Sequence, residues 1–103
     1  MFIFRLCYHS ISQGKIVRGV VISNPDNPTG RVYTKAEIMD VLEMCAKHQL
    51  HVVMDEIYAL SVFGDVVFES VLSFPDIPDP KRTHFLWSVS KVGFSLVLVD
   101  IIN

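Results

Sequence analysis

Two closely spaced Asn-Pro dipeptides and a glycine interrupt the chain directly after a hydrophobic run. The run covers residues 17–22, and Asn24-Pro25-Asp26-Asn27-Pro28-Thr29-Gly30 follows it. Each proline disfavours helical backbone in the residue before it, so we predict that a strand ends here in an extended turn. Ligands of open α/β sheets bind at the edge where the carboxyl ends of the strands lie. This turn is therefore a candidate part of a binding site.

A helix is predicted directly after this turn. Thr34 and Glu37 have the capping-box spacing, in which each side chain accepts a hydrogen bond from the backbone N–H of the other residue. Apolar residues recur at helical spacing from Ile38 to Cys45. A second strand is predicted at 50–54, and a strand, a helix and a strand in this order make a βαβ unit.

The second half of the chain has fewer clear patterns. Three prolines in 75–80 predict a loop, and the apolar run 83–88 predicts a third strand. Residues 66–68 indicate a further short strand, and Gly64 a turn before it. No element is predicted within 1–13. The expected fold class is α/β with a mostly parallel sheet.

Composition limits the classes of protein that this chain can belong to. Its 103 residues allow one domain at most, and a hydrophobic share of 50% with 19% charged residues is typical of strands buried on both faces. The net charge of -2 does not favour nucleic acid as a partner. Cys7 and Cys45 have no CxxC spacing, and no signal peptide or membrane-spanning segment is evident. We expect a cytoplasmic protein with no membrane partner.

Three motifs resemble segments of the class I aminotransferases, which depend on pyridoxal phosphate (PLP) and have fold type I. The turn at 24–30 resembles the NPxNPTG segment, residues 54–58 resemble the DE-x-Y segment, and residues 87–91 resemble the S-x-S-K segment. They occur in the order of the family, each at the end of an apolar run. The resemblance identifies the chain as a member of this class I/II family.

The resemblance implies a partial domain. Residues 14–91 would form part of the PLP-binding large domain, a three-layer α/β/α structure. Residues 1–13 are an unmatched N-terminal segment, and 92–103 are a divergent tail. The upstream phosphate turn and the small domain of the family have no counterpart in this sequence.

The resemblance also implies roles for five residues. Lys91 would bond covalently to the cofactor and then move the proton at the substrate's Cα. Asp55 would keep the ring nitrogen protonated. Asn27 and Tyr58 would donate hydrogen bonds to the phenolic oxygen, and Ser88 would bind the phosphate.

Two stretches, 55–63 and 78–84, are similar to the 1-aminocyclopropane-1-carboxylate synthase-like subgroup. This implies an amino acid or S-adenosylmethionine as the substrate in the parent family, whose members are homodimers. Transamination and elimination both stay open, because a shared fold does not decide the reaction.

One departure from the family pattern bears on activity. Val99 occupies the position, eight residues after Lys91, where the family has an arginine that binds the cofactor phosphate. The chain is therefore expected to be inactive as a fragment, although its parent would be a PLP enzyme. The alternative is a non-catalytic, isoform-like fragment that acts, if at all, by associating with a full-length partner.

Two other classes of site are disfavoured. Residues 52–56 have the form of the strand that binds magnesium in ATPases, but the required phosphate loop is absent. His48 and His51 have an H-x-x-H spacing, yet no third ligand is evident, so no metal site is expected.

Overall fold

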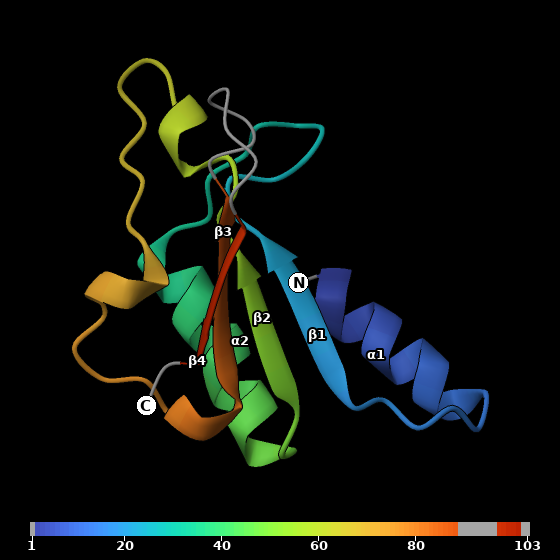
Figure 1. Ribbon diagram of the computed structural model, residues 1–103. Helices are drawn as coiled ribbons and strands as arrows, with labels where there is room; N and C mark the ends of the chain where they lie inside the picture. The colour runs from blue at the N-terminus through green and yellow to red at the C-terminus, as the bar shows by residue number, and fades with distance from the viewer. Residues whose placement is uncertain (1, 89–96, 102–103) are drawn as a thin grey trace.

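The structure is a computed structural model that describes residues 2–88 and 97–101. In chain order its helices and strands are α1 (Phe2–Ser12), β1 (Gly19–Ser23), α2 (Lys35–Lys47), β2 (His51–Asp55), β3 (Thr83–Ser88) and β4 (Val97–Ile101). Short 3-10 helices are η1 (Ala59–Ser61), η2 (Val71–Ser73) and η3 (Pro80–Arg82). The strands form one sheet in the order β1-β2-β3-β4 (Figure 1). β1, β2 and β3 are parallel and β4 is antiparallel, so the prediction of a mostly parallel α/β fold is confirmed.

The predicted capping box begins α2. The Thr34 hydroxyl accepts a hydrogen bond from the Glu37 N–H at 3.2 Å, and the Glu37 carboxylate accepts one from the Thr34 N–H at 2.9 Å. The Thr34 backbone bond is the main cause that lowers the pKa of Glu37. Two orphan amides of the first turn are thus satisfied locally, which is why sequence alone locates this helix start.

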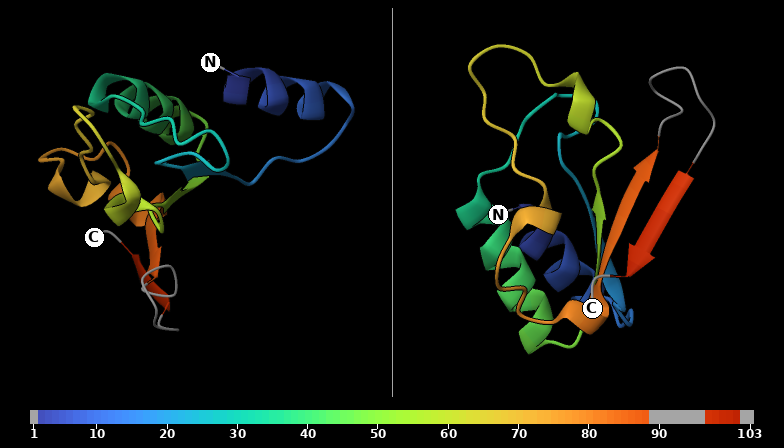
Figure 2. Two further views of the ribbon diagram at one scale, coloured as in Figure 1. Left: turned by 90° about the horizontal axis from the view of Figure 1, so that it is seen from above. Right: turned by 60° about the vertical axis from the view of Figure 1, so that its left-hand side comes forward.

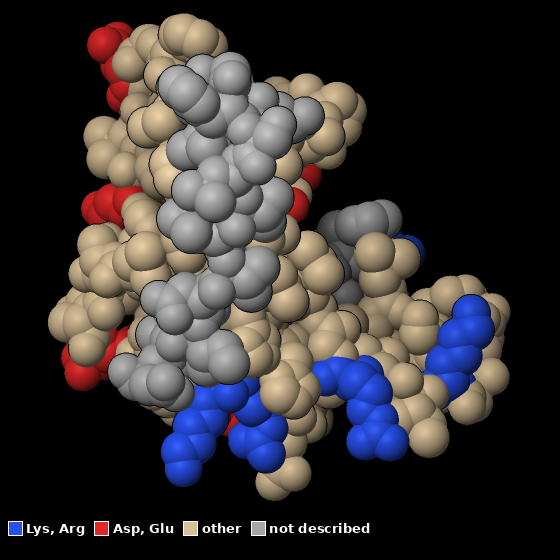
Figure 3. All heavy atoms as spheres, viewed as in Figure 1, with Lys and Arg blue, Asp and Glu red and all other residues tan. Residues whose placement is uncertain are grey.

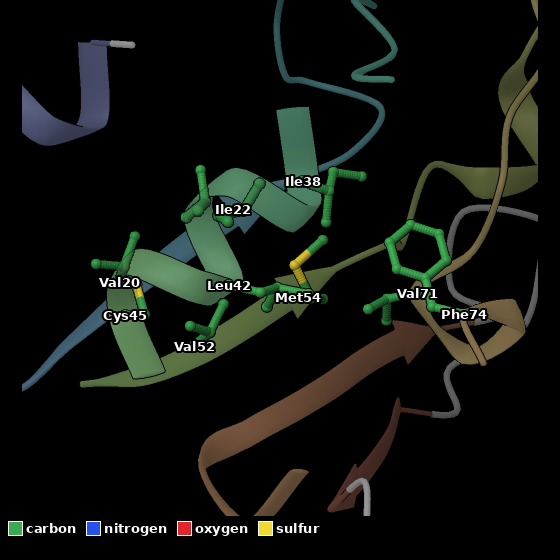
Figure 4. Close-up of a cluster of buried hydrophobic side chains, with 10 residues drawn as sticks. Val20, Ile22, Ile38, Leu42, Cys45, Val52, Met54, Val71 and Phe74 are labelled. Atoms are coloured by element: carbon green, nitrogen blue, oxygen red, sulfur yellow. The ribbon is translucent and has the colours of Figure 1, made fainter. Parts of the chain in front are cut away.

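The hydrophobic core lies between α2 and one face of the sheet (Figure 4). Side chains alternate between the faces of a strand, so every second residue of β1 and β2 points toward α2. The buried apolar residues are Val20, Ile22, Ile38, Val41, Leu42, Cys45, Val52, Met54, Val71 and Phe74. Figure 2 shows α1 beside α2 on the same side of the sheet. Val21, whose side chain points to the other face, is 63% exposed.

Several elements differ from the sequence-based expectations. Residues 2–12 form α1, although no element was predicted there. The helix places Cys7 against the core and leaves Tyr8 77% exposed. Residues 66–68 are not a strand because they lie outside the sheet, and Val67 is 77% exposed. β4 was not predicted either.

Candidate functional site

The carboxyl ends of the three parallel strands lie at one edge of the sheet. In the strand register, Ser23 at the end of β1 is opposite Asp55 at the end of β2, and Asp55 is opposite Leu86 of β3. The loops that follow β1 and β2 both leave from this edge, which is at the top of Figure 1. Parallel pairing therefore brings the Asn-Pro turn and the Asp55–Tyr58 segment together, as the motif order predicted.

The Asn-Pro turn is held by its own hydrogen bonds. The Gly30 N–H donates to the Asp26 carbonyl at 2.8 Å, and Gly30 has a φ of 70°, which favours glycine. The Thr29 hydroxyl donates to the Asp26 carboxylate at 2.6 Å. Asn27 lies in this turn with an exposed side chain. The turn thus presents the Asn27 amide at the edge of the sheet.

The Asn27 amide lies beside the Tyr58 hydroxyl. The Asn27 Nδ2 atom is 3.5 Å from the Tyr58 Oη atom, at the outer limit of a hydrogen bond. The two residues belong to different loops, 31 positions apart in the sequence. The structure therefore brings together two of the predicted cofactor-binding residues, and both can donate to a shared acceptor.

Asp55 is the last residue of β2 and is half-buried. Its Oδ1 atom accepts a hydrogen bond from the Ile57 N–H at 3.3 Å. This bond orients one carboxylate oxygen toward the turn that leads to Tyr58. Asp55 is thus an anionic group at the same edge as Asn27.

Ser88 and Lys91 complete the predicted set. Ser88 is the last residue of β3, so it lies at the carboxyl edge, and it is 5% exposed. Lys91 is outside the described residues. The structure therefore places four of the five predicted residues at one edge of the sheet and does not address the fifth.

Two buried polar residues were missed as parts of this site. Asn24 is 0% exposed, and its Oδ1 atom accepts a hydrogen bond from the Tyr33 N–H at 2.9 Å. The Asn24 Nδ2 atom is buried and has no hydrogen-bond partner within residues 2–88 and 97–101. Glu56 is 1% exposed, and its Oε1 atom accepts a hydrogen bond from the Val71 N–H at 2.7 Å.

A signal for both residues exists in the strand alternation. Asn24 continues the inward-facing series of Val20 and Ile22, and Glu56 continues that of Met54. A polar residue on the buried phase of a strand needs a partner inside the protein. Burial raises the pKa of Glu56, against the smaller lowering effects of hydrogen bonds from Ser70 and Val71.

The described residues fit the polar atoms of a pyridine ring with a phenolic oxygen. Asn27 and Tyr58, each of which carries a hydrogen-bond donor, lie side by side, with the Asn27 Nδ2 atom 3.5 Å from the Tyr58 Oη atom. The Asp55 carboxylate lies at the same edge and can accept from a protonated ring nitrogen.

No cluster of three or more His, Cys, Asp or Glu side chains suited to a metal ion occurs within 2–88 and 97–101. Neither described helix is long and apolar enough to cross a membrane.

Comparisons with known proteins agree on one family. The profile of the family "Aminotransferase class I and II" matches residues 7–94. The mouse 1-aminocyclopropane-1-carboxylate synthase-like protein 1 is 48% identical over 81 residues, which are 78% of this chain and 16% of that protein. The mouse "Probable inactive 1-aminocyclopropane-1-carboxylate synthase-like protein 2" is 51% identical over 80 residues, which are 77% of this chain and 14% of that protein. The chain thus spans a small part of the curated relatives that it matches.

The fold is similar to that of solved aminotransferases. The crystal structure of tyrosine aminotransferase from Leishmania infantum has a TM-score of 0.72 at 28% sequence identity. The match covers 90% of this chain and 24% of the Leishmania chain. With the family profile, this similarity supports the fold assignment as part of a fold type I domain. The chain belongs to the class I and II aminotransferase family.

Proposed function

We propose that this chain carries the ring-binding part of a pyridoxal phosphate site. The observation that carries the proposal is the pair of donors, Asn27 and Tyr58, which lie 3.5 Å apart at the edge where Asp55 ends β2. The family assignment supports it. The chain spans 16% of the length of the mouse relative. We therefore propose cofactor binding for this chain, and we propose catalysis only for a longer parent protein.

Each residue has a proposed task. When bound, pyridoxal phosphate supplies a ring that accepts the electrons released at the substrate's Cα. Asp55 holds a proton on the ring nitrogen, and Asn27 and Tyr58 donate hydrogen bonds to the phenolic oxygen. Ser88 binds a phosphate oxygen. Lys91 would hold the cofactor through its side-chain amine and would move the proton at the substrate's Cα.

The proposed substrate of the parent is an amino acid. Relatives named for 1-aminocyclopropane-1-carboxylate synthase add S-adenosylmethionine, itself an amino acid derivative, as a candidate. Both candidates carry a primary amine next to a carboxylate. Assays of a longer parent with both compounds would separate transamination from elimination.

A covalent trapping experiment tests cofactor binding. The chain is incubated with pyridoxal phosphate and reduced with borohydride, and intact mass and peptide mapping then locate the adduct. We expect one adduct on Lys91 that the Lys91→Ala variant loses. Lys81→Ala is the matched control, because Lys81 is an exposed lysine before β3, at the opposite edge of the sheet. Adducts spread evenly over the lysines would refute the proposed function.

A second set of variants tests the ring contacts. Tyr58→Phe and Asn27→Ala each remove one donor to the phenolic oxygen, so each should weaken binding by about fivefold to tenfold. Thr29→Ala, in the same turn as Asn27, is the control for a general loosening of the turn. Circular dichroism of every variant checks that the fold is retained.

A further inference from the structure

Glu56 lies between two of the proposed ring-binding residues in the sequence. It follows Asp55 directly and precedes Tyr58 by two positions. At 1% exposure, it is among the most buried side chains of the structure. Its carboxyl group is covered by protein atoms.

The backbone of Glu56 is anchored on both sides. Its N–H donates to the Leu86 carbonyl of β3 at 2.9 Å, which extends the pairing of β2 and β3 by one bond. Its carbonyl accepts from the Ala59 N–H at 3.0 Å, so the turn that carries Tyr58 begins at Glu56. The position of this residue therefore decides where that turn leaves the sheet.

The side chain of Glu56 fixes the far end of the same loop. Its Oε1 atom accepts from the Val71 N–H at 2.7 Å, across 15 positions of the sequence. Val71 begins η2, is 1% exposed and belongs to the hydrophobic core. The bond closes residues 57–70 into a loop whose two ends are held together inside the protein. Tyr58 lies next to this closure.

The hydrogen bond that closes the loop 57–70 needs an acceptor atom but does not need a charged carboxylate. Burial raises the pKa of Glu56, so the ionised form is disfavoured in this environment. A glutamine of nearly the same shape could accept the same bond through its amide oxygen, whereas alanine could not. The two substitutions therefore separate loss of the acceptor from loss of the charge.

We propose that Glu56 is a positioning residue: the hydrogen bond that it accepts from the Val71 N–H closes the loop 57–70 and holds the Tyr58 hydroxyl beside the Asn27 amide. The inference rests on the proposed function, because it assigns Glu56 to the same ring-binding pair. Glu56 touches neither cofactor nor substrate in this proposal.

The first measurement does not need the cofactor. In the full chain, hydrogen exchange of the Val71 amide and a nuclear Overhauser effect between the Asn27 amide and the Tyr58 ring are compared among variants. We expect Glu56→Ala to speed Val71 exchange at least tenfold and to abolish the Asn27–Tyr58 contact, with Glu56→Gln retaining both. Glu69→Ala, an exposed glutamate in the same loop, should change neither. An intact Asn27–Tyr58 contact in Glu56→Ala would overturn the proposal.

The second measurement uses affinity for pyridoxal phosphate by equilibrium dialysis. Glu56→Ala should weaken binding about tenfold in the wild-type background and less than twofold in the Tyr58→Phe background, because its effect acts through Tyr58. Equal losses in both backgrounds would mean a merely structural role and would overturn the proposal. If Glu56→Ala does not fold, Glu56→Asp replaces it in both measurements. The aspartate side chain is one methylene shorter, so its carboxyl group cannot accept the Val71 N–H hydrogen bond at the same distance.

Failure of the proposed function is distinguishable from failure of this inference. A wild-type chain that does not bind pyridoxal phosphate would refute the function, while the exchange and contact measurements would still decide whether Glu56 positions Tyr58. Binding by the wild type with an unaffected Glu56→Ala variant would refute only the inference.

Discussion

Two pairs of polar residues, one at each edge of the parallel sheet, differ in their burial. At the carboxyl edge, Asn24 and Glu56 are at most 1% exposed, and each accepts a hydrogen bond from a backbone N–H across a loop. At the amino edge, the rings of His51 and His84 form an exposed hydrogen bond, with His51 Nδ1 2.9 Å from His84 Nε2. The amino edge is at the bottom of Figure 3, where most of the visible Lys and Arg atoms also lie.

The length of the connecting segments causes this difference. Residues 24–34 and 56–82 leave from the carboxyl ends of β1 and β2, and within them the Tyr33 N–H and the Val71 N–H donate to Asn24 and Glu56. By contrast, only residues 48–50 join α2 to the amino end of β2, where His51 is exposed. A polar group that a loop buries must form its hydrogen bonds within the protein, so these bonds help to fix the position of the loop. An exposed polar group can form hydrogen bonds with water instead.

The largest expected effect of this difference is at Glu56. Glu56→Ala removes the acceptor of the buried Val71 N–H and leaves a small cavity, so it should lower the free energy of unfolding by about 2 kcal/mol. Glu69→Ala, on an exposed residue of the same loop, should change it by less than about 0.5 kcal/mol. Urea denaturation of both variants measures the contrast. Equal losses would break the comparison between buried and exposed polar groups.

Asn24→Ala should have the second largest effect. The Tyr33 N–H loses its buried acceptor, but the unpaired Asn24 Nδ2 atom also disappears, so we expect a net loss of about 1–2 kcal/mol. The matched control is Asn27→Ala in the same turn, whose side chain is exposed and should contribute less than about 0.5 kcal/mol. A larger loss for the control than for Asn24→Ala would contradict the interpretation.

The helix cap at the carboxyl edge should contribute less. Thr34→Ala removes the acceptor of the Glu37 N–H at the start of α2 and should cost about 1 kcal/mol in the free energy of unfolding. Thr34→Ser keeps the hydroxyl and should retain most of the stability. A serine variant as unstable as the alanine variant would show that the threonine methyl group, rather than the cap, matters.

The pH dependence of stability should sharpen the assignment of Glu56. Its folded-state pKa is raised above the ordinary value of 4.5 by burial, so the folded protein binds this proton more tightly than the unfolded chain does. The contribution of Glu56 to stability is therefore complete below about pH 4 and is lost as the pH rises through the folded-state pKa. Relative to Glu56→Gln, the wild type should lose stability as the pH rises above the ordinary pKa of 4.5. Parallel pH profiles of the two proteins in thermal denaturation would exclude this behaviour.

The smallest effect is expected at the amino edge. The His51–His84 hydrogen bond competes with water, so His51→Ala should change the free energy of unfolding by less than about 0.5 kcal/mol. A double-mutant cycle with His84→Ala measures the coupling of the two rings directly, and His48→Ala is the control at the same edge. A coupling energy as large as the effect of Asn24→Ala would remove the contrast between the edges.

The elements that sequence predicted correctly depend on short-range patterns. The capping box locates the start of α2 from residues three positions apart, and the apolar run 83–88 coincides with β3. Motifs at three strand ends predicted a shared edge, because parallel strands place their carboxyl ends together. The proximity of Asn27 and Tyr58 followed from this argument. Their actual separation could not, since it depends on two loops.

The elements that sequence missed depend on long-range packing. In α1, Cys7 packs on the core while Leu6 and Ile11 remain 49% and 58% exposed. β4 pairs with β3, and nothing in its own sequence indicates which strand would accept it. Residues 66–68 have a strand-like composition, but no strand within 2–88 and 97–101 pairs with them.

The sequence by itself determined the family, the βαβ order and the edge where the candidate site lies, because capping, turn formation and strand alternation act over a few residues. Only the tertiary structure decided that Glu56 meets Val71 across 15 positions and that Asn24 closes the Asn-Pro turn onto Tyr33. Local patterns do not specify such partners. They are selected when loops fold over a sheet edge and every buried polar group must find its hydrogen bond inside the protein.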